Sequence, residues 1–274
     1  MDLNKILKFS RSYRGLFDER ISTWLYKRYI KRGDYSGITW FNNEDIAIHY
    51  TSKEYIERRV WMLGDYEPEV NSVFNAFVPV KGTVLDIGAN IGINSIRLSK
   101  CVTSEGKVYS FEPIPFNQKR LEKNLLLNSV QNVSVTPIAL GLNNEEVRVM
   151  FNEQEENMGA ISLRNQNAEG ILVQVRNGDD WINENNIEKI DFMKIDVEGF
   201  EWNVISGLKE TIGRDHPRIL IEWDLNYLLY SGKSADEWQQ FIDKFGYQIY
   251  QINRYELKQL TSIREALDGN LLFI

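Results

Sequence analysis

Residue types suited to holding a nucleoside-containing cofactor occur at two points of the chain with a fixed spacing. An apolar run at residues 83–87 ends in the small-residue turn 88–92, and a second apolar run at 108–111 ends on Glu112 and Pro113. Glycine lets a backbone turn tightly and approach a ligand closely. A carboxylate at the tip of the second strand can accept hydrogen bonds from both hydroxyls of a ribose. The pattern therefore predicts a site for an adenosine-containing cofactor.

The spacing of the glycines indicates which cofactor this is. A dinucleotide-binding turn has the pattern G-x-G-x-x-G and offers a helix N-terminus to a pyrophosphate. Here the pattern is Asp86-x-Gly88-x-x-x-Gly92, with Asn90 at the place of the second glycine. An acid before the turn suits a ligand that carries an ammonium group, which favours S-adenosylmethionine over a dinucleotide. The alternative is a doubly wound protein whose turn is glycine-rich for structural reasons alone.

A second group of ionisable residues lies at the ends of two later strands. In the apolar run at 190–196, alternation places Lys194 and Asp196 on one face, and a lysine in a central strand is costly unless it is paired. The next strand, 218–223, contains Glu222 near its carboxyl end. Ligands of open α/β sheets bind outside these ends. We therefore predict catalytic roles for Asp196 and Glu222, with Lys194 as their buried counter-ion.

The acids that follow this strand allow a second interpretation. Asp196, Glu198 and Glu201 precede or occupy a first helical turn, where the helix dipole favours anions by about 0.3–1 kcal/mol each. For Glu201 we prefer this structural interpretation.

Strand and helix patterns alternate from residue 82 onward, which predicts an α/β fold with a doubly wound, mostly parallel sheet of seven strands. A last strand antiparallel to its neighbours is expected at either 256–260 or 270–274. The predicted strands are 82–87, 107–112, 132–136, 190–196, 217–223 and 247–252, and the predicted helices are 91–101, 115–128, 198–208 and 234–244.

Between residues 143 and 177 the alternation stops and short apolar runs are separated by polar residues and glycine. The runs at 147–151, 160–163 and 171–175 predict extra antiparallel strands inserted beside the sheet. A turn at 157–159 within this insert is expected to overhang the site. The resulting domain organisation is an N-terminal helical extension or cap at 1–63 and a catalytic domain at 64–274.

Composition narrows the class of protein. The chain has 274 residues, 43% of them hydrophobic, and a net charge of −7, which argues against a general nucleic-acid binder. No apolar run approaches the roughly 20 residues that cross a bilayer, and no signal peptide is recognisable. Cys101 is the only cysteine, so neither an internal disulfide nor a cysteine-based metal site is expected. A cytoplasmic location is the simplest interpretation.

The first 33 residues differ from the rest in charge. They hold nine lysines and arginines against three acids, a net charge of +6 that leaves −13 for the remainder. Apolar residues from Phe9 to Leu25 recur at helical spacing, so this segment is predicted to be amphipathic with a basic face. The structural alternative is a helix packed on the catalytic domain with a solvated basic side. The functional alternatives are contact with an anionic membrane surface or recruitment of an anionic substrate.

Four motifs in this order and spacing resemble the FkbM-type methyltransferases: residues 85–92, 111–113, 194–199 and 221–222. The resemblance covers residues 64–274. It implies a class I methyltransferase fold, which is Rossmann-like, with S-adenosylmethionine as methyl donor and S-adenosylhomocysteine as product. It also implies an oxygen acceptor on a sugar, a polyketide or a related metabolite.

The resemblance also implies the roles of individual residues. Asp86, Gly88, Ala89 and Asn90 would line the methionine end of the donor, and Glu112, followed by Pro113, would hold the ribose. Ile138 and Ala139 would lie near the adenine, and Tyr66 and Glu67 would close over the cofactor. Asp196 would belong both to the donor site and to the catalytic group.

Metal and histidine chemistry have weaker support in the sequence. His216 lies in a helix-to-strand loop and is expected to be structural, and His49 is the one histidine placed to reach an acceptor. No histidine spacing typical of a metal site occurs. Mg²⁺ held by carboxylates is possible but not favoured, because no third protein ligand is evident beside Asp196 and Glu222.

These observations predict a methyltransferase that acts on a hydroxyl of a small molecule, sugar, or glycan or natural-product precursor. A nicotinamide-dependent oxidoreductase is the first rival, and the missing second glycine disfavours it. A non-catalytic adenosine-binding scaffold protein is the second. The acceptor and the oligomeric state cannot be read from the sequence.

Overall fold

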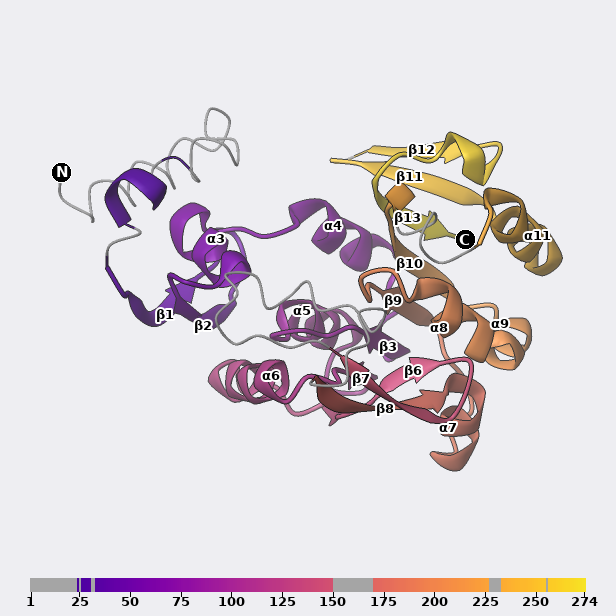
Figure 1. Cartoon of the computed structure of the whole chain (residues 1–274), viewed down its shortest axis with the longest axis horizontal. Helices are drawn as coiled ribbons and strands as arrows, with labels where there is room; N and C mark the ends of the chain where they lie inside the picture. The colour runs from indigo at the N-terminus through magenta and orange to yellow at the C-terminus, as the bar shows by residue number, and fades with distance from the viewer. Residues whose placement is uncertain (1–23, 25, 31–32, 150–169, 227–232, 255) are drawn as a thin grey trace.

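The computed structural model of the chain describes residues 24, 26–30, 33–149, 170–226, 233–254 and 256–274 (Figure 1). Its N-terminal part contains the π-helical turn η1 (Tyr26–Ile30) and a hairpin of strands β1 (Ser36–Trp40) and β2 (Ala47–Thr51). Helices α3 (Tyr55–Leu63) and α4 (Pro68–Phe77) follow and lead into the central sheet. No helix among the described residues is long and apolar enough to cross a bilayer.

The central sheet has eight strands in the order β12-β11-β13-β10-β9-β3-β4-β5. Strands β10, β9, β3, β4 and β5 pair in parallel, and β13 is antiparallel to both β10 and β11. The strand bounds are β3 Thr83–Ile87, β4 Lys107–Phe111, β5 Val133–Thr136, β9 Phe192–Ile195, β10 Arg218–Trp223, β11 Ile249–Asn253, β12 Glu256–Leu260 and β13 Gly269–Phe273.

This topology confirms the predicted doubly wound, mostly parallel sheet with an antiparallel strand near its end. The two tail segments offered as alternatives are both strands, because β12 adds to the edge of β11 while β13 inserts between β11 and β10. The sheet therefore has one strand more than the seven predicted.

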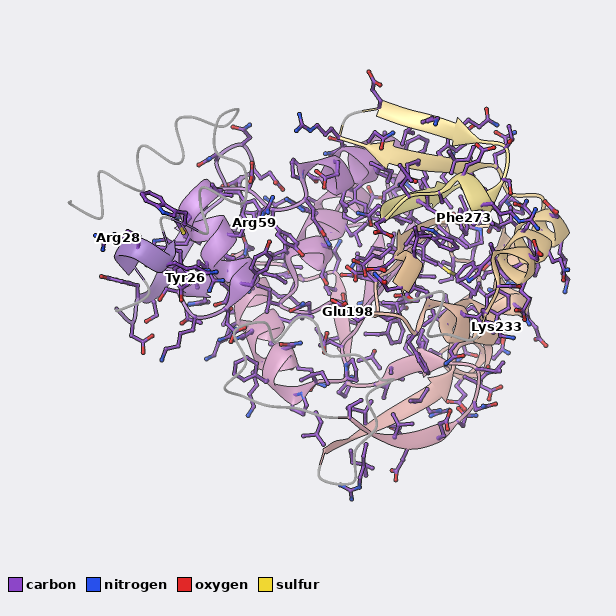
Figure 2. All side chains as sticks on the ribbon, turned by 45° about the horizontal axis from the view of Figure 1, so that its top comes forward. Tyr26, Arg28, Arg59, Glu198, Lys233 and Phe273 are labelled. Atoms are coloured by element: carbon purple, nitrogen blue, oxygen red, sulfur yellow. The ribbon has the colours of Figure 1, made fainter. Side chains whose placement is uncertain are left out.

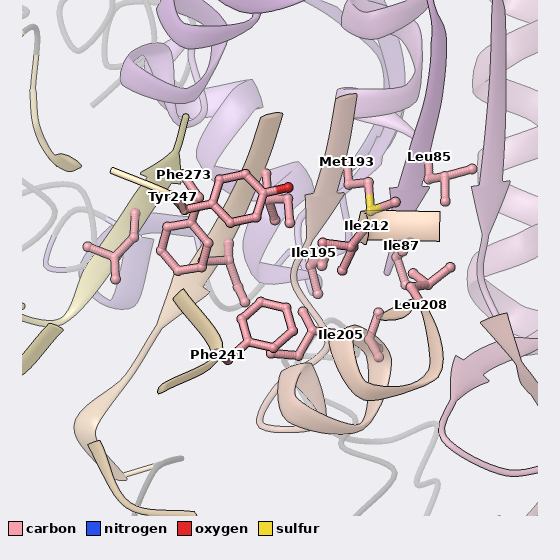
Figure 3. Packing of buried hydrophobic residues seen from close by; sticks show 14 of the residues in the cluster. Leu85, Ile87, Met193, Ile195, Ile205, Leu208, Ile212, Phe241, Tyr247 and Phe273 are labelled. Carbon is pink, nitrogen blue, oxygen red and sulfur yellow. The ribbon is translucent and has the colours of Figure 1, made fainter. Parts of the chain in front are cut away.

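Helices cover both faces of the sheet because residues of each central strand alternate between the faces. In β3, Leu85 and Ile87 belong to the cluster that includes α7, α8, α9 and α11, whereas Val84 packs with α4 and α5. Figure 3 shows the first of these clusters from close by. The helix bounds are α5 Ile93–Val102, α6 Pro115–Leu127, α7 Gly178–Glu184, α8 Glu201–Gly207, α9 Lys209–Asp215 and α11 Ala235–Phe245.

The predicted helices are all present, with shifted ends and four additions. The helix predicted at 198–208 begins only at Glu201, because Glu198 and Gly199 both have positive φ angles, 53° and 94°. Separate helices at α3, α4, α7 and α9 were not predicted from the sequence, although α3 lies within the predicted helical extension at 1–63. Each has at most ten residues, so its apolar face is too short for a clear period.

The described residues of the insert, together with Ala139–Gly141, form a separate sheet of three strands in the order β6-β8-β7. Strands β7 (Glu145–Val149) and β8 (Ile171–Asn177) are antiparallel, as predicted, but β6 (Ala139–Gly141) is an unpredicted strand parallel to β8. The predicted strand at 160–163 and the turn at 157–159 lie outside the described residues.

The N-terminal extension was predicted to be helical. This prediction is wrong for residues 36–51, which form the β1–β2 hairpin. On the side of β2 that faces away from β1, side chains from α6 and its C-terminal end take the place of a neighbouring strand by bonding to the backbone of β2. Asn128 accepts from the Ala47 N–H at 3.0 Å and donates to the Ala47 carbonyl at 2.7 Å, and Asn124 accepts from the His49 N–H at 2.9 Å. These amides fix the hairpin to the core. The predicted boundary between residues 63 and 64 stays a prediction.

Asn128→Ala should destabilise the protein by about 2 kcal/mol, because it leaves the buried N–H and C=O of Ala47 without partners. Chemical denaturation measures this loss. Asn75→Ala is the control, since Asn75 is an exposed residue of α4 that donates to the Asn71 carbonyl one turn earlier. Equal losses in the two variants would contradict the proposed role of Asn128.

Candidate functional site

A cavity of about 200 Å³ lies at the carboxyl ends of β3, β4, β9 and β10. It brings together segments that are far apart in the sequence: the turn after β3, the end of β4, the loop after β9 and the segment between α3 and α4. The predicted site residues that line it are Tyr66, Glu67, Gly88, Asn90, Glu112, Pro113, Ala139, Asp196 and Glu222.

Gly88 is the point of closest backbone approach in the turn. Its φ is +84°, and a Cβ atom built on it would lie 1.8 Å from the Asp196 carbonyl oxygen. Only glycine is compatible with both facts. The N–H groups of Gly88 and Ala89 donate to the Phe111 carbonyl at 3.0 Å, so the turn is also tied to the end of β4. The glycine turn after β3 is therefore held against the carboxyl ends of β4 and β9.

Glu112 is buried at the end of β4 and faces the same turn. Its Oε2 accepts from the Asn90 N–H at 2.8 Å and its Oε1 from the Ile114 N–H at 2.9 Å. Burial raises the pKa of Glu112 to about 7, although these backbone hydrogen bonds lower it. Each carboxylate oxygen has a further lone pair. Glu112 thus lines the cavity as predicted and can accept hydrogen bonds from a ribose.

Asp86 and Ala89 do not line the cavity, contrary to the role that the resemblance implied. Strand alternation turns Asp86 toward α5, where its Oδ2 accepts from the Ser95 hydroxyl at 2.6 Å. Asp86 also lies opposite Lys194 in the register of β3 and β9. Ala89 is buried among apolar residues behind the turn. Asp86 is therefore a buried residue behind the cavity, where it contacts Ser95 and neighbours Lys194.

Lys194, Asp196 and Glu222 lie together, as predicted, at the ends of the adjacent strands β9 and β10. The Lys194 ammonium donates to Asp196 Oδ2 at 2.8 Å and to the Gly88 carbonyl at 3.4 Å. Burial acts to lower the pKa of Lys194, but the carboxylates of Asp196, Asp86 and Glu67 raise it above its ordinary value. The lysine therefore stays charged and fixes the position of Asp196.

The surroundings of Glu222 favour its protonated form. Its burial, and then the neighbouring carboxylates of Asp196 and Glu198, raise the pKa of Glu222 well above its ordinary range. Two carboxyl groups in contact cannot both ionise easily, so they share one proton. Asp196 accepts from the Lys194 ammonium, and the raised pKa of Glu222 favours its neutral form.

Glu198 is a site residue that the sequence interpretation missed. One oxygen from each of Asp196, Glu198 and Glu222 lies within 4.8 Å of the others. Figure 2 places Glu198 near the centre of the molecule. The sequence pattern assigned it to a helix, and its left-handed backbone instead turns it to the cavity. The following Gly199 was the available signal, since glycine favours such turns. A third carboxylate is thus present, contrary to expectation.

Glu201 supports the loop that carries these acids. Its Oε1 accepts from the N–H groups of Val197 at 3.1 Å and Gly199 at 3.0 Å. Burial raises the pKa of Glu201 to about 7. Glu201 does not line the cavity, so the geometry agrees with the structural interpretation.

Tyr66 and Glu67 form one wall of the cavity, as predicted. Glu67 has a left-handed backbone with φ 44°, and its Oε2 accepts from Asn94 Nδ2 at 3.5 Å. Burial and Asp196 raise the pKa of Glu67, whereas Lys194 and Arg97 lower it. The wall therefore adds a further acid to the side of the cavity that contains Asp196.

The remaining predicted residues fall on both sides of the cavity boundary. Ala139 lines it, whereas Ile138 packs into the apolar core. His49 is exposed on β2 and is not a lining residue. His216 ends α9, with its ring stacked on Tyr247 and hydrogen-bonded to the Phe245 carbonyl at 2.7 Å. His216 is thus structural, as predicted.

A family model described as the methyltransferase FkbM domain matches residues 86–249, which is more than half of the chain. The chain belongs to the FkbM methyltransferase family. The fold is accordingly the class I methyltransferase fold that the resemblance implied, and the cofactor is S-adenosylmethionine.

Individual relatives of this FkbM chain are distant. The hexuronic acid methyltransferase AglP of Haloferax volcanii is 26% identical over 129 residues, which are 46% of this chain and 50% of AglP. The 2-O-methyltransferase NoeI of Sinorhizobium fredii is 28% identical over 146 residues, 47% of this chain and 58% of NoeI. The chain thus spans about half the length of these relatives.

Among solved structures, an FkbM methyltransferase from Methylobacillus flagellatus covers 71% of this chain and 44% of its own, with 20% identity and a TM-score of 0.47. The fold assignment rests on the family match and the strand order above.

The cavity residues fit this cofactor. The glycine turn leaves room for close backbone approach, Glu112 supplies acceptors for ribose hydroxyls, and the acids around Asp196 suit a ligand that carries an ammonium and a sulfonium group. No phosphate-binding cation lines the cavity among the described residues. The donor set therefore agrees with S-adenosylmethionine better than with a dinucleotide.

The affinity for S-adenosylhomocysteine should rise with pH through about 7. A carboxyl group whose pKa is raised on folding from 4.5 to about 7 stabilises the folded protein below 4.5, and this contribution is lost as the pH rises through 7. Ribose hydroxyls donate best to the ionised form, so ligand binding should compensate for that loss. Calorimetric titration between pH 6 and 8 measures the effect.

Glu112→Gln is the matched variant for this titration. Its amide group places a donor opposite the N–H of Asn90 or Ile114. The variant also loses the charge-assisted hydrogen bonds from the ribose hydroxyls, about 1.5–3 kcal/mol each, so the affinity for S-adenosylhomocysteine should fall at least tenfold. Unchanged affinity in this variant would remove Glu112 from the cofactor site.

Proposed function

We propose that this chain is an S-adenosylmethionine-dependent O-methyltransferase that acts on a hydroxyl of a small molecule, a sugar, or a glycan or natural-product precursor. The observation that carries the proposal is Asp196, paired with the Lys194 ammonium, beside Glu222 in the cofactor cavity, where burial and neighbouring acids raise the pKa of Glu222. The names of AglP and NoeI, a hexuronic acid methyltransferase and a 2-O-methyltransferase, support a sugar hydroxyl as acceptor.

The bound cofactor supplies an electrophilic methyl group, and the chain's own residues must orient the acceptor and remove its proton. Asp196 is suited to accept that proton because it lines the cavity and the Lys194 ammonium holds its Oδ2 at 2.8 Å. Glu222, as a neutral acid, can donate a hydrogen bond to Asp196 or to the acceptor oxygen. The pair therefore offers one acceptor and one donor to the same hydroxyl.

The two rival functions have less support. A nicotinamide-dependent oxidoreductase would need its pyrophosphate at a glycine-rich helix N-terminus, and Asn90 takes the place of the second glycine here. A non-catalytic scaffold protein would bind the donor without transferring a methyl group. Methyl transfer to an acceptor separates this last function from the proposed one, because donor binding alone yields no methylated product.

The role of the basic N-terminal segment concerns residues 1–33, of which 1–23, 25, 31 and 32 lie outside the described residues. Tyr26 is buried, and the Arg58 guanidinium of α3 lies over its ring at 4.0 Å. This contact supports a packed segment over a membrane-bound one. Contact with an anionic surface or substrate stays a prediction.

Asp196→Asn should lower methyl transfer by about 10²-fold or more while leaving S-adenosylhomocysteine affinity within a few-fold, since the general base is lost but the donor contacts remain. Glu222→Gln is the matched control, because an amide resembles the protonated acid, and its loss should be smaller. Transfer of a radiolabelled methyl group to a panel of glycosides measures both. Equal turnover in Asp196→Asn and the parent protein would limit Asp196 to a structural role.

Chelation of divalent cations by EDTA should leave methyl transfer unchanged. The ammonium of Lys194 already pairs with Asp196, and the raised pKa of Glu222 favours its protonated form, so two of the three clustered carboxyls are poor ligands for Mg²⁺. The measurement compares transfer rates with EDTA, and with EDTA followed by excess Mg²⁺. A loss that Mg²⁺ restores would favour a metal-assisted reaction and assign Glu198 as the third ligand.

A further inference from the structure

The turn that joins β1 to β2 braces the segment between α3 and the cavity wall. Asn42 donates from its side chain to the Leu63 carbonyl at 2.9 Å and from its backbone to the Gly64 carbonyl at 2.8 Å. Gly64 ends α3 with φ 73°, and a Cβ there would collide with the Asn42 side chain. The chain direction into Tyr66 is thus set by contact with the hairpin turn.

Arg97 of α5 extends this brace to the cavity wall itself. Its Nη2 donates to the Tyr66 carbonyl at 2.7 Å, and its Nε and Nη2 donate to the two carboxylate oxygens of Glu44 at 2.8 and 2.7 Å. The guanidinium also lies 5.2 Å from the ring centre of Phe41. One side chain, 1% exposed, therefore joins the hairpin turn to the wall residue Tyr66.

The neighbouring Glu67 is held from the same helix. Arg97 Nη1 donates to Asn94 Oδ1 at 3.3 Å, and Asn94 Nδ2 donates to Glu67 Oε2 at 3.5 Å. The charge of Arg97 also lowers the pKa of Glu67 against the effect of burial. The helix that follows the glycine turn thus positions both wall residues.

Two energetic constraints make the position of the cavity wall depend on the contact between Glu44 and Arg97. A buried guanidinium without its carboxylate partner would be strongly unfavourable, and the planar fork of arginine fits a carboxylate in a way that lysine cannot. The left-handed backbone of Glu67 costs about 1–3 kcal/mol and persists only where surrounding contacts determine it. Loss of the Glu44 contact should therefore release Arg97, and with it the wall.

We propose that Arg97 is a positioning residue through which the N-terminal hairpin, by way of Glu44, sets the affinity of the cavity for the methyl donor. The inference rests on the assignment of the cavity to S-adenosylmethionine. It makes the hairpin part of the cofactor site, although β1 and β2 contribute no lining residue among those described.

Glu44→Gln and Arg97→Lys test the proposal by calorimetric titration with S-adenosylhomocysteine, at a temperature where each variant is fully folded by near-ultraviolet circular dichroism. Both should weaken binding by about five- to thirtyfold, in the lower part of the usual range of about 5- to 150-fold for coupling between sites. Glu184→Gln is the matched control, since it breaks a two-bond pair with Arg176 in the insert, at 2.6 and 2.7 Å, away from the cavity. Affinity within twofold of the parent in both test variants would overturn the proposal.

Hydrogen exchange on the unmodified protein gives a second measurement that does not depend on a variant's folding. Because coupling is reciprocal, S-adenosylhomocysteine should slow exchange of the amides of Phe41 and Asn42 as well as those at the cavity. Protection confined to the cavity residues would overturn the proposed coupling while leaving the cofactor assignment intact. Absence of any binding to the parent protein would instead contradict the methyltransferase function.

Discussion

The candidate site depends on the buried ammonium group of Lys194 and its contacts with the surrounding oxygens. This ammonium donates to Asp196 and to the Gly88 carbonyl, and Lys194 lies opposite Asp86 in the sheet, so it joins the glycine turn to the clustered acids of the cavity. Its charge also acts on the buried carboxyls of Glu67 and Glu112, whose pKa values it lowers. Without this cation, the paired strands β3 and β9 would bury several acids with no opposite charge in their midst.

Backbone conformations outside the regular elements place the acids around that charge. Glu67, Asn90 and Glu198 line the cavity, and all three have positive φ angles, as does Gly88. Such conformations are uncommon for residues other than glycine and concentrate at functional sites. Hydrogen bonds hold them in place: Glu112 accepts from Asn90, and Glu201 accepts from the loop that contains Glu198. The strands thus fix the edge of the site, and these strained turns direct its side chains.

Buried charge pairs connect the outer parts of the fold to this edge. Arg97 joins the hairpin turn to Tyr66, and Arg120 of α6 binds the buried Glu57 of α3 at 2.9 Å. Asn128 replaces a strand neighbour for Ala47. The N-terminal hairpin is therefore attached through specific polar contacts with two helices of the core. The family model matches residues 86–249, so the hairpin lies outside the matched region. These contacts nevertheless connect the hairpin to the wall of the cofactor cavity.

The sequence by itself determined the alternation of the main strands and helices from residue 82 onward, the glycine turn, and the grouping of Lys194, Asp196 and Glu222, because these depend on local periodicity and on the rule that parallel strands end at one edge. Only the tertiary structure decided that Asp86 lies beneath the cavity, that Glu198 joins the acids, and that Arg97 braces Tyr66. Side-chain alternation, a left-handed backbone and a contact between residues 97 and 44 produce these features. The first two have local signals in the sequence, but which side chains then meet at the cavity depends on how distant segments pack together.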